Sequence, residues 1–154
     1  MISNDFLQHE EFMRQALKLA REAEAAGEVP VGAVIVLDGK IIGCGRNSPV
    51  SASDPTAHAE ILALREAGRA IGNYRIEGAS LYATLEPCVM CAGALVAARI
   101  TKLVFGARDL RFGGVRSKFQ IADSDVLNHR IVITEGILGA ECTQLIQDFF
   151  AKRR

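Results

Sequence analysis

The chain has 154 residues, with 18 basic and 18 acidic side chains, so its formal net charge is zero. A hydrophobic content of 49% and a charged content of 23% exclude an intrinsically disordered chain. This length suffices to bury a core, and the chain shows no repeat, low-complexity tract or linker. We therefore expect a single domain over residues 1–154.

The predicted elements begin with an amphipathic helix over residues 6–26, where apolar side chains recur at helical spacing until Gly27 ends it. Residues 31–37 read as a strand. Asp38-Gly39 then forms a tight turn, and residues 40–45 return antiparallel to the first strand. The chain therefore begins with a helix and a hairpin.

After a polar loop at 46–57, helices and strands alternate. The predicted elements are a helix at 58–70, a strand at 79–84, a helix at 88–98, strands at 102–105 and 130–134, and a helix at 138–151. The glycine-containing connection before the last strand is expected to hold some helix near 116–127. A hairpin followed by this alternation predicts a mixed sheet with helices on both faces. Helices that start at 58 and 88 would begin at the same edge of that sheet.

The charge distribution, the apolar stretches and the cysteines indicate where in the cell the protein is expected. The basic residues concentrate in 99–154, most densely in 99–118. This asymmetry fits contact with a polyanion. When only the charge is considered, however, a solvent-exposed face is the better explanation. The apolar stretches 31–37 and 92–98 are far shorter than the roughly 18–20 residues that span a bilayer. Residues 1–12 carry acids where a targeting peptide needs bases. We expect a cytoplasmic protein, with no membrane contact, whose four cysteines serve metal binding or packing.

Two fragments carry the chemistry: His58-Ala59-Glu60 and the segment from Pro87 to Cys91. Cys88 and Cys91 are three residues apart and share one face of a helix, whose N-terminus favours thiolates. Pro87 suits the start of that helix. Two thiolates and an imidazole make three zinc ligands and leave a fourth position for water, which is typical of catalytic zinc.

A deaminase also needs a group that moves protons. Zinc lowers the pKa of a bound water to about 7, but deamination further requires protons on a ring nitrogen and on the departing amine. A carboxyl group beside the water can deliver both. Glu60 follows the ligand His58 by two residues in the first turn of its helix, so we predict that it is the proton shuttle and not a fourth ligand.

The cysteines are also compatible with other functions. The CxxC pair could be a redox pair, but Pro87 stands where thioredoxin-like sites usually have an aromatic residue. Half of a structural zinc site is also disfavoured, because a second CxxC or HxxxH is lacking. Cys44 and Cys142 lie in apolar patterns and are interpreted as packing residues. His9 and His129 lack the spacing of ligands and are interpreted as surface or structural residues.

The pattern H-x-E…P-C-x-x-C is the signature of zinc-dependent nucleobase deaminases. The fragments AHAEI, TLEPCVMCAGAL, VFGARD, LNH, ITEGIL and FFAKRR further resemble the bacterial tRNA-specific adenosine deaminases of the cytidine/deoxycytidylate deaminase superfamily. This resemblance extends from residue 28 to the C-terminus. It implies a cytidine-deaminase-like three-layer α/β/α sandwich with a five-stranded mixed sheet.

The resemblance also implies an activity and an assembly. The substrate would be the wobble adenosine in the anticodon stem-loop of an arginine tRNA, converted to inosine by a homodimer with one Zn²⁺ per subunit. His58, Cys88 and Cys91 would hold the zinc, and Glu60 would move protons. The substrate-binding residues implied by the family are Asn47, Val29, Ala59, Asp109, Phe149 and Arg153.

Their implied roles differ. Asn47 would hydrogen-bond the flipped nucleoside, or it only caps a turn. Val29 and Ala59 would line the base pocket. Asp109 would contact the backbone of the neighbouring nucleotide. Phe149 and Arg153 would contact the anticodon loop. Alternatively, at least one of Phe149 and Phe150 belongs to the apolar side of the last helix, and Arg153 and Arg154 could be solubilising residues at a frayed helix end.

The chain departs from the family at 110–118, where Phe112 and Arg116 are bulkier than the usual small-residue loop. Arg116 could contact a phosphate, and Phe112 could stack on a base or pack on the protein. Two other functions stay open. One is deamination of a free base or nucleotide, such as guanine or cytosine. The other is a non-catalytic, zinc-stabilised RNA-binding subunit, in which Glu60 would have no use.

Overall fold

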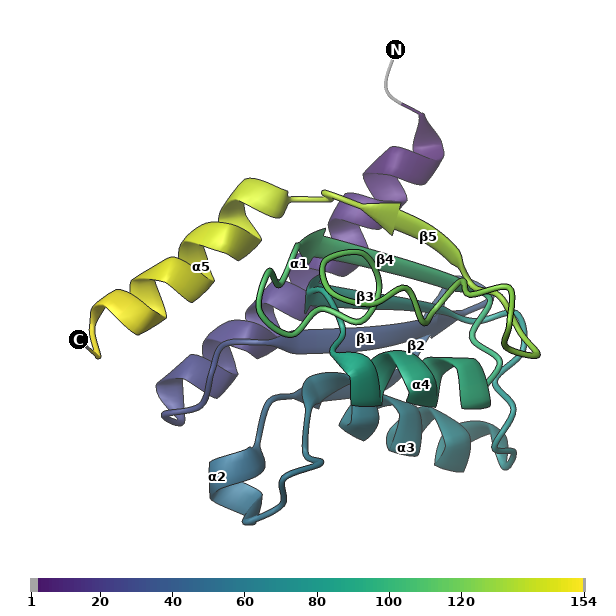
Figure 1. Ribbon diagram of the computed structural model, residues 1–154, viewed down its shortest axis with the longest axis horizontal. Coiled ribbons are helices and arrows are strands. Elements are labelled where there is room, and N and C mark those ends of the chain that lie inside the picture. Colours follow the sequence, from purple (N-terminus) through teal and green to yellow (C-terminus); the bar gives the residue numbers. More distant parts are fainter. Residues whose placement is uncertain (1–2, 154) are drawn as a thin grey trace.

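The computed structural model describes residues 3–153. Its elements, in chain order, are α1 (Asn4–Ala25), β1 (Gly32–Leu37), β2 (Lys40–Arg46), α2 (Pro49–Ala52), α3 (Ala59–Ile71), β3 (Ser80–Leu85), α4 (Val89–Ala97), β4 (Lys102–Ala107), β5 (Val132–Glu135) and α5 (Gly139–Ala151). The strands form one sheet in the order β2-β1-β3-β4-β5 (Figure 1). Strand β1 is antiparallel to β2 and β3, whereas β3, β4 and β5 are parallel, so the predicted five-stranded mixed sheet is confirmed.

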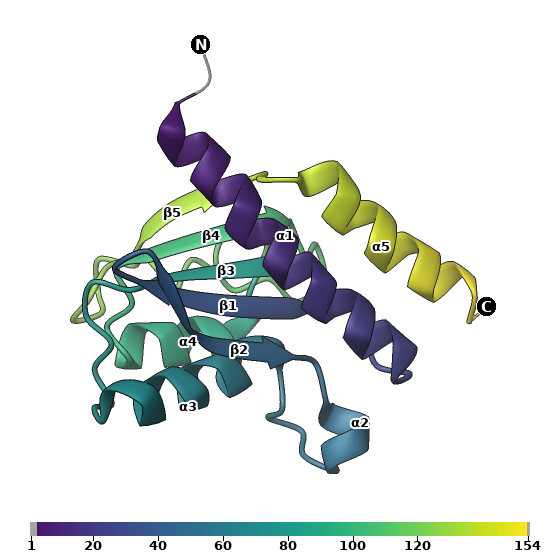
Figure 2. The same cartoon turned by 180° about the vertical axis from the view of Figure 1, so that it is seen from behind.

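Helices cover both faces of the sheet. Helices α1 and α5 lie on one face and α3 and α4 on the other (Figure 2). Strand β1 shows why both faces are apolar: Ala33 and Ile35 join the core beneath α3 and α4, and Val34 and Val36 join the core beneath α1. Alternate side chains of a strand point to opposite faces, so a continuous apolar run serves two cores. The three-layer sandwich is confirmed.

A close backbone approach fixes where α3 begins. A Cβ atom added to Gly45 in β2 would lie 2.0 Å from the carbonyl oxygen of Ala59, and one added to Gly43 would lie 2.3 Å from that of Ala63. Only glycine fits where the backbone of a helix lies this close to a strand. The first turn of α3 is therefore held tightly against the end of β2.

Two predictions about the loops are wrong. Residues 46–57 contain the short helix α2, which was not predicted. The helix expected near 116–127 is replaced by turns. The reason lies in the hydrogen bonds: the N–H groups of Arg116 and Ser117 donate to the carboxylate of Glu86 rather than to a preceding turn of helix. Among residues 3–153, none of the helices combines the length and the apolar character that crossing a membrane demands.

Candidate active site

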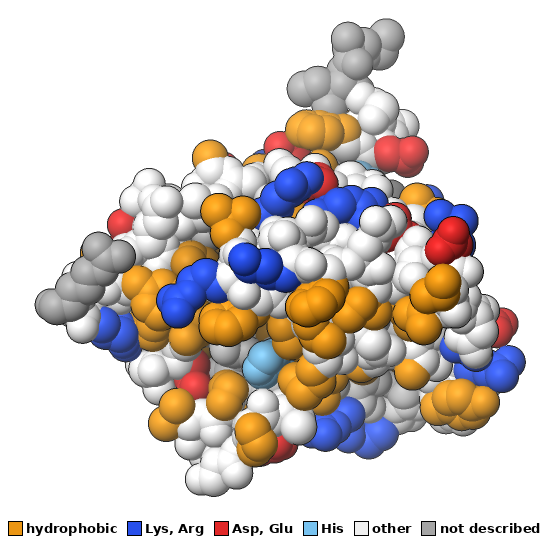
Figure 3. Space-filling model, in the orientation of Figure 1, with side chains coloured by type: hydrophobic (Ala, Val, Ile, Leu, Met, Phe, Trp, Pro, Cys, Tyr) orange, Lys and Arg blue, Asp and Glu red, His pale blue; other side chains and the backbone are white. Residues whose placement is uncertain are grey.

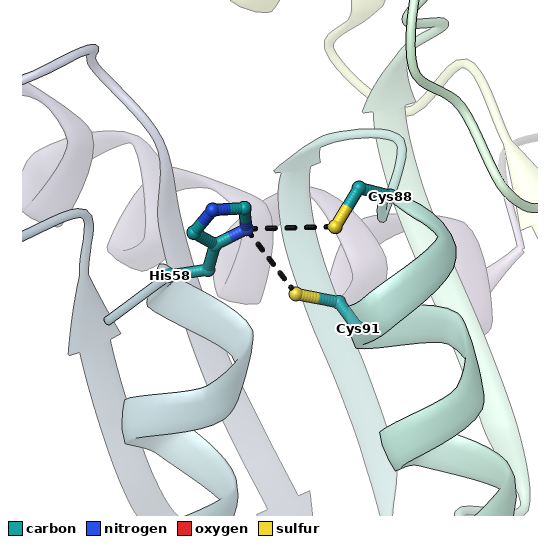
Figure 4. A group of neighbouring side chains, drawn as sticks. All are labelled: His58, Cys88 and Cys91. Atoms are coloured by element: carbon teal, nitrogen blue, oxygen red, sulfur yellow. Dashed lines mark hydrogen bonds between the residues drawn. The ribbon is translucent and has the colours of Figure 1, made fainter. Parts of the chain in front are cut away.

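Two helix N-termini bring the predicted zinc ligands together. His58 is the N-cap residue of α3, and Cys88 is the N-cap residue of α4, with Cys91 in the first turn after it. The Nδ1 atom of His58 lies 3.5 Å from the Sγ atom of Cys88 and 3.5 Å from that of Cys91. The three side chains point toward one another across the gap between the two helices (Figure 4). The donor atoms all lie within 4.8 Å of one another.

This spacing fits a zinc ion. With Zn–N of about 2.0–2.1 Å and Zn–S of about 2.3 Å, a tetrahedral centre places a nitrogen and a sulfur ligand roughly 3.5 Å apart. The cysteines are free thiols, so both sulfurs are available to a metal. His58 and Cys88 also line a cavity, so a ligand in that cavity can approach the donor group. The arrangement is that of a catalytic zinc site.

The ionisation of the two sulfur atoms also favours a bound cation. The hydrogen bond from Cys91 lowers the pKa of Cys88 to about 4, with His58 adding to the effect. The same hydrogen bond, together with burial, raises the pKa of Cys91. The hydrogen bond with Cys88 raises the pKa of His58. Without a metal, therefore, Cys88 ionises readily and Cys91 does not. A divalent cation would stabilise both thiolates and the neutral imidazole at once.

Glu60 is a buried carboxyl group next to the zinc donors. It stands in the first turn of α3, is only 3% exposed, and lines the same cavity as His58 and Cys88. Burial raises the pKa of Glu60 to about 7. A carboxyl group whose pKa is close to neutrality can both take up and release a proton, as general acid–base catalysis requires.

Asn47 and Ala59 are linked to each other. The N–H of Ala59 donates to Oδ1 of Asn47 over 3.3 Å, and the N–H of Asn47 donates to the carbonyl of Val31 over 3.0 Å. Asn47 therefore both caps the start of α3 and lines the cavity, with its amide nitrogen still available as a donor. Val29 lines the cavity as well, whereas Ala59 is fully buried.

The cavity has a volume of about 1200 Å³ and opens to solvent. Its lining includes His58, Glu60 and Cys88, here called the floor, and the side chains of Val29, Val31, Asn47, Leu85 and Glu86. The rest of the lining comes from two further parts of the chain. One is the segment after β4, here called the rim loop (residues 108–117), of which residues 108–112 line the cavity. The other is the inward face of α5. Basic and hydrophobic side chains are interspersed on this face of the molecule, with a histidine visible between them (Figure 3).

The rim loop is internally bonded. The Oδ1 atom of Asp109 accepts the N–H groups of Arg111 and Phe112, each over 3.1 Å. The guanidinium of Arg111 lies 5.4 Å from the centre of the Phe112 ring, which is exposed. Arg116 forms two bonds of 2.9 and 3.0 Å with the carboxylate of Asp123. Its guanidinium is thus engaged within the protein, which does not favour the phosphate contact considered for it.

Helix α5 separates the roles of its two aromatic residues. Phe149 is 3% exposed, and its ring lies beneath the guanidinium of Arg153, whose Cζ atom is 3.5 Å from the ring centre. Phe150 is 44% exposed and lines the cavity together with Ile146 and Arg153. Of the two aromatic rings on α5, the exposed ring of Phe150 is therefore the one available to a ligand.

Two buried carboxylates, Glu86 and Glu28, were not predicted from the sequence. Glu86 accepts hydrogen bonds from the rim loop, and Glu28 accepts those of Val50 and Ser51 at the start of α2. An acidic residue at the end of an apolar strand, directly before PCxxC, is the only signal that pointed to Glu86.

The remaining cysteines and histidines are structural, as predicted. Cys142 is buried in the core beneath α1, and Cys44 is partly buried and packs against the same core. The Nδ1 atom of His9 lies 2.7 Å from the hydroxyl of Tyr82, and Nε2 of His129 lies 2.7 Å from the carbonyl of Ile100.

A comparison with protein families matches residues 7–107 to the zinc-binding region of cytidine and deoxycytidylate deaminases. The chain is a member of this deaminase family. The matched residues include His58, Cys88 and Cys91, and their geometry fits one zinc ion per subunit. The deaminase is therefore a zinc-dependent enzyme.

Relatives narrow the position of the deaminase within the family. It is 53% identical over 146 residues to the tRNA-specific adenosine deaminase of Haemophilus influenzae, covering 94% of the chain and 84% of the relative. A solved tRNA:A34 deaminase, which performs A-to-I editing at the wobble position of transfer RNA, matches with a TM-score of 0.85 and 42% identity over 88% of the chain and 98% of its own. Guanine deaminase from Nitrosomonas europaea matches with a TM-score of 0.80 and 25% identity over 98% and 94%. The resemblance to tRNA-specific adenosine deaminases is confirmed.

Proposed function

We propose that the protein converts adenosine to inosine at the wobble position of a tRNA anticodon, with an arginine tRNA as substrate. The observation that carries the proposal is that the three zinc donors cluster beside an open cavity, which is lined by two of them, His58 and Cys88, and by Glu60. The similarity to tRNA-specific adenosine deaminases supports the choice of substrate.

The residues on the floor of the cavity perform the chemistry. His58, Cys88 and Cys91 would hold the zinc, which when bound would supply a nucleophile at neutral pH by lowering the pKa of a water to about 7. Glu60 takes up a proton from the attacking water and delivers it to N1 of the adenine ring as the water oxygen bonds to C6. Glu60, ionised again, takes the proton of the new hydroxyl group at C6 and transfers it to the amine at C6, which leaves as ammonia while the C6 carbonyl of inosine forms. Water is consumed, ammonia is released and inosine remains.

The walls of the cavity hold the nucleoside. Asn47 is fixed by the N–H of Ala59 and offers its amide nitrogen to the base or ribose, and Val29 packs against the base. The adenosine must leave its stack to enter, which costs a few kcal/mol and is cheapest in a single-stranded loop. Burial of Glu60 keeps bulk water from its carboxyl group during proton transfer.

The rim binds the anticodon loop around the target. Arg111 and Arg153 line the mouth of the cavity and meet phosphates, a contribution that weakens as salt increases. Asp109 shapes the loop that faces the neighbouring nucleotide, and the exposed ring of Phe150 offers a surface on which a base stacks. Phe149 supports this surface from within by carrying Arg153.

We further propose that the protein is a homodimer located in the cytoplasm, where tRNA is modified. The support for a dimer is an exposed apolar area formed by Val89, Phe112 and Phe119. These residues are neighbours, because Cys88 forms a β-bridge with Gly113 and the N–H of Phe119 donates to the carbonyl of Gly113. Exposed apolar patches often mark protein–protein interfaces.

The test is to incubate the purified protein with total bacterial tRNA and to map adenosine-to-inosine changes by sequencing. We expect inosine at the wobble position of an arginine tRNA, and none with the Glu60→Ala variant, which keeps its zinc. Ammonia release from free guanine, cytidine or adenosine, without any change in tRNA, would instead establish the small-molecule deaminase. Tight tRNA binding without turnover of any substrate would establish the non-catalytic RNA-binding subunit.

A further inference from the structure

Glu86 is a buried carboxylate to which the proposed reaction gives no role. It follows the last residue of β3 and is 2% exposed. Its Oε1 atom accepts the N–H of Asp109 over 3.0 Å and the hydroxyl of Ser117. Its Oε2 atom accepts the N–H groups of Val115, Arg116 and Ser117 over 3.1, 2.7 and 3.0 Å. Both ends of the rim loop therefore bond to this one side chain.

The backbone around Glu86 is shaped to fit it. A Cβ atom added to Gly113 would lie 2.3 Å from Oε2 of Glu86 and 2.6 Å from the carbonyl oxygen of Asp109. The N–H of Gly114 donates to the carbonyl of Pro87 over 2.8 Å, and Gly113 forms a bridge with Cys88. The rim loop thus wraps around the carboxylate and is fastened to the segment that begins the zinc-binding helix.

This arrangement joins the two functional parts of the cavity. Towards α4, the chain continues from Glu86 through Pro87 to the zinc ligand Cys88. On its other side, Glu86 holds the loop whose residues 109–112 line the mouth of the cavity. The rim loop contains no helix, so its shape depends on hydrogen bonds such as these, together with those of Asp109 and the bridge between Gly113 and Cys88.

We propose that Glu86 is a positioning residue for RNA binding: it holds residues 109–112 at a fixed place relative to the zinc centre. The proposal rests on the proposed function in taking RNA as the ligand of the rim loop. A carboxylate suits this task because both of its oxygens only accept hydrogen bonds. A glutamine of the same size would direct an NH₂ group at backbone N–H groups and leave buried donors without partners.

The test compares Glu86→Gln with Ser117→Ala, which removes only the hydroxyl bond to Glu86. Glu77→Gln is the matched control, because Glu77 is exposed and outside the cavity. Each protein is assayed for zinc content, for kcat and KM on an anticodon stem-loop hairpin, and for amide hydrogen exchange. For Glu86→Gln we expect KM to rise about tenfold or more, as loss of charged hydrogen bonds predicts, with kcat within about threefold of wild type.

The other readouts separate positioning from general damage. Amides of residues 109–117 should exchange faster in Glu86→Gln, while zinc stays at one per chain and α1 keeps its protection. Ser117→Ala should shift KM and exchange in the same direction by less, and Glu77→Gln should match the wild type. If Glu86→Gln does not fold, Ser117→Ala decides by the same measurements.

Three results would overturn the proposal: an unchanged KM, a fall in kcat at constant KM, or a loss of activity in proportion to lost zinc. Failure of the proposed function is distinguishable, because the wild type itself would then leave the hairpin unmodified. The exchange of residues 109–117 would still report whether Glu86 holds the loop.

Discussion

The floor and the rim of the cavity are built in different ways. The zinc donors His58, Cys88 and Cys91 lie at the starts of two helices that pack on one face of a sheet. The rim loop has neither helix nor strand and takes its shape from polar bonds to Asp109 and Glu86. Regular elements thus fix the chemical centre, and a few buried carboxylate bonds fix the surface that meets the ligand.

This difference separates catalysis from recognition. Because the floor is held by core packing, substitutions there should act on zinc binding or on kcat and leave the rest of the fold in place. Substitutions at the rim should act chiefly on KM. The following predictions test that division, from the largest expected effect to the smallest.

Cys91→Ser should abolish activity. Cys91 is fully buried and contributes one of three zinc donors, so its loss should leave less than one zinc per chain and no measurable inosine. Cys44→Ser is the matched control, since Cys44 lies outside the site. Metal analysis and inosine formation check both variants. Full zinc and activity in Cys91→Ser would show that Cys91 is not a ligand.

Glu60→Gln should lower kcat by roughly 10²–10⁴-fold, the usual contribution of a positioned general acid–base group. Zinc content and KM should remain close to those of the wild type, because the amide keeps the size of the carboxyl group. Steady-state kinetics on the anticodon hairpin measure this. A rise in KM at constant kcat would mean that Glu60 binds substrate and does not transfer protons.

The neighbours Phe149 and Phe150 should respond in opposite ways. Phe150→Ala should raise KM roughly tenfold with little change in stability, because base stacking on an aromatic ring contributes about 1–3 kcal/mol. Phe149→Ala should lower the free energy of unfolding by about 3–5 kcal/mol, as expected for a buried phenylalanine. Kinetics and urea unfolding of both variants check the pair. Reversed effects would contradict the placement of the two rings.

Glu28 gives the smallest predicted effect, on acid stability. The hydrogen bond from the Ser51 side chain, with others from backbone, lowers the pKa of Glu28 below its ordinary value of 4.5. The folded state therefore favours the ionised carboxyl group, which stabilises the protein above about pH 4.5, and this contribution is lost as the pH falls through the lowered value. Urea unfolding midpoints of wild type and Glu28→Gln should differ at neutral pH and converge in acid. A gap that is independent of pH would contradict this.

The sequence predicted the floor of the cavity well because its residues report on helix starts. HxE and PCxxC place His58, Glu60 and Cys88 at the first turns of α3 and α4, and the alternation of elements places both turns at one edge of the sheet. The sheet itself followed from apolar runs such as 31–37.

The rim could not be predicted in the same way. Glycines and polar residues in 113–117 indicate neither helix nor turn until the partner of their N–H groups, Glu86, is known. That partner lies far away along the chain, since Glu86 and Val115 are 29 positions apart. Likewise, the adjacent residues Phe149 and Phe150 are both apolar, and only the packing of α5 shows which one is buried.

The most direct test of the central claim is zinc K-edge X-ray absorption of the purified protein, with metal analysis of the same sample. We predict one zinc per chain, bound by two sulfur atoms at about 2.3 Å and by nitrogen and oxygen ligands at about 2.0–2.2 Å. The oxygen ligand would mark the open position beside Glu60. A centre with four sulfur ligands, or protein that deaminates its substrate without zinc, would contradict the account.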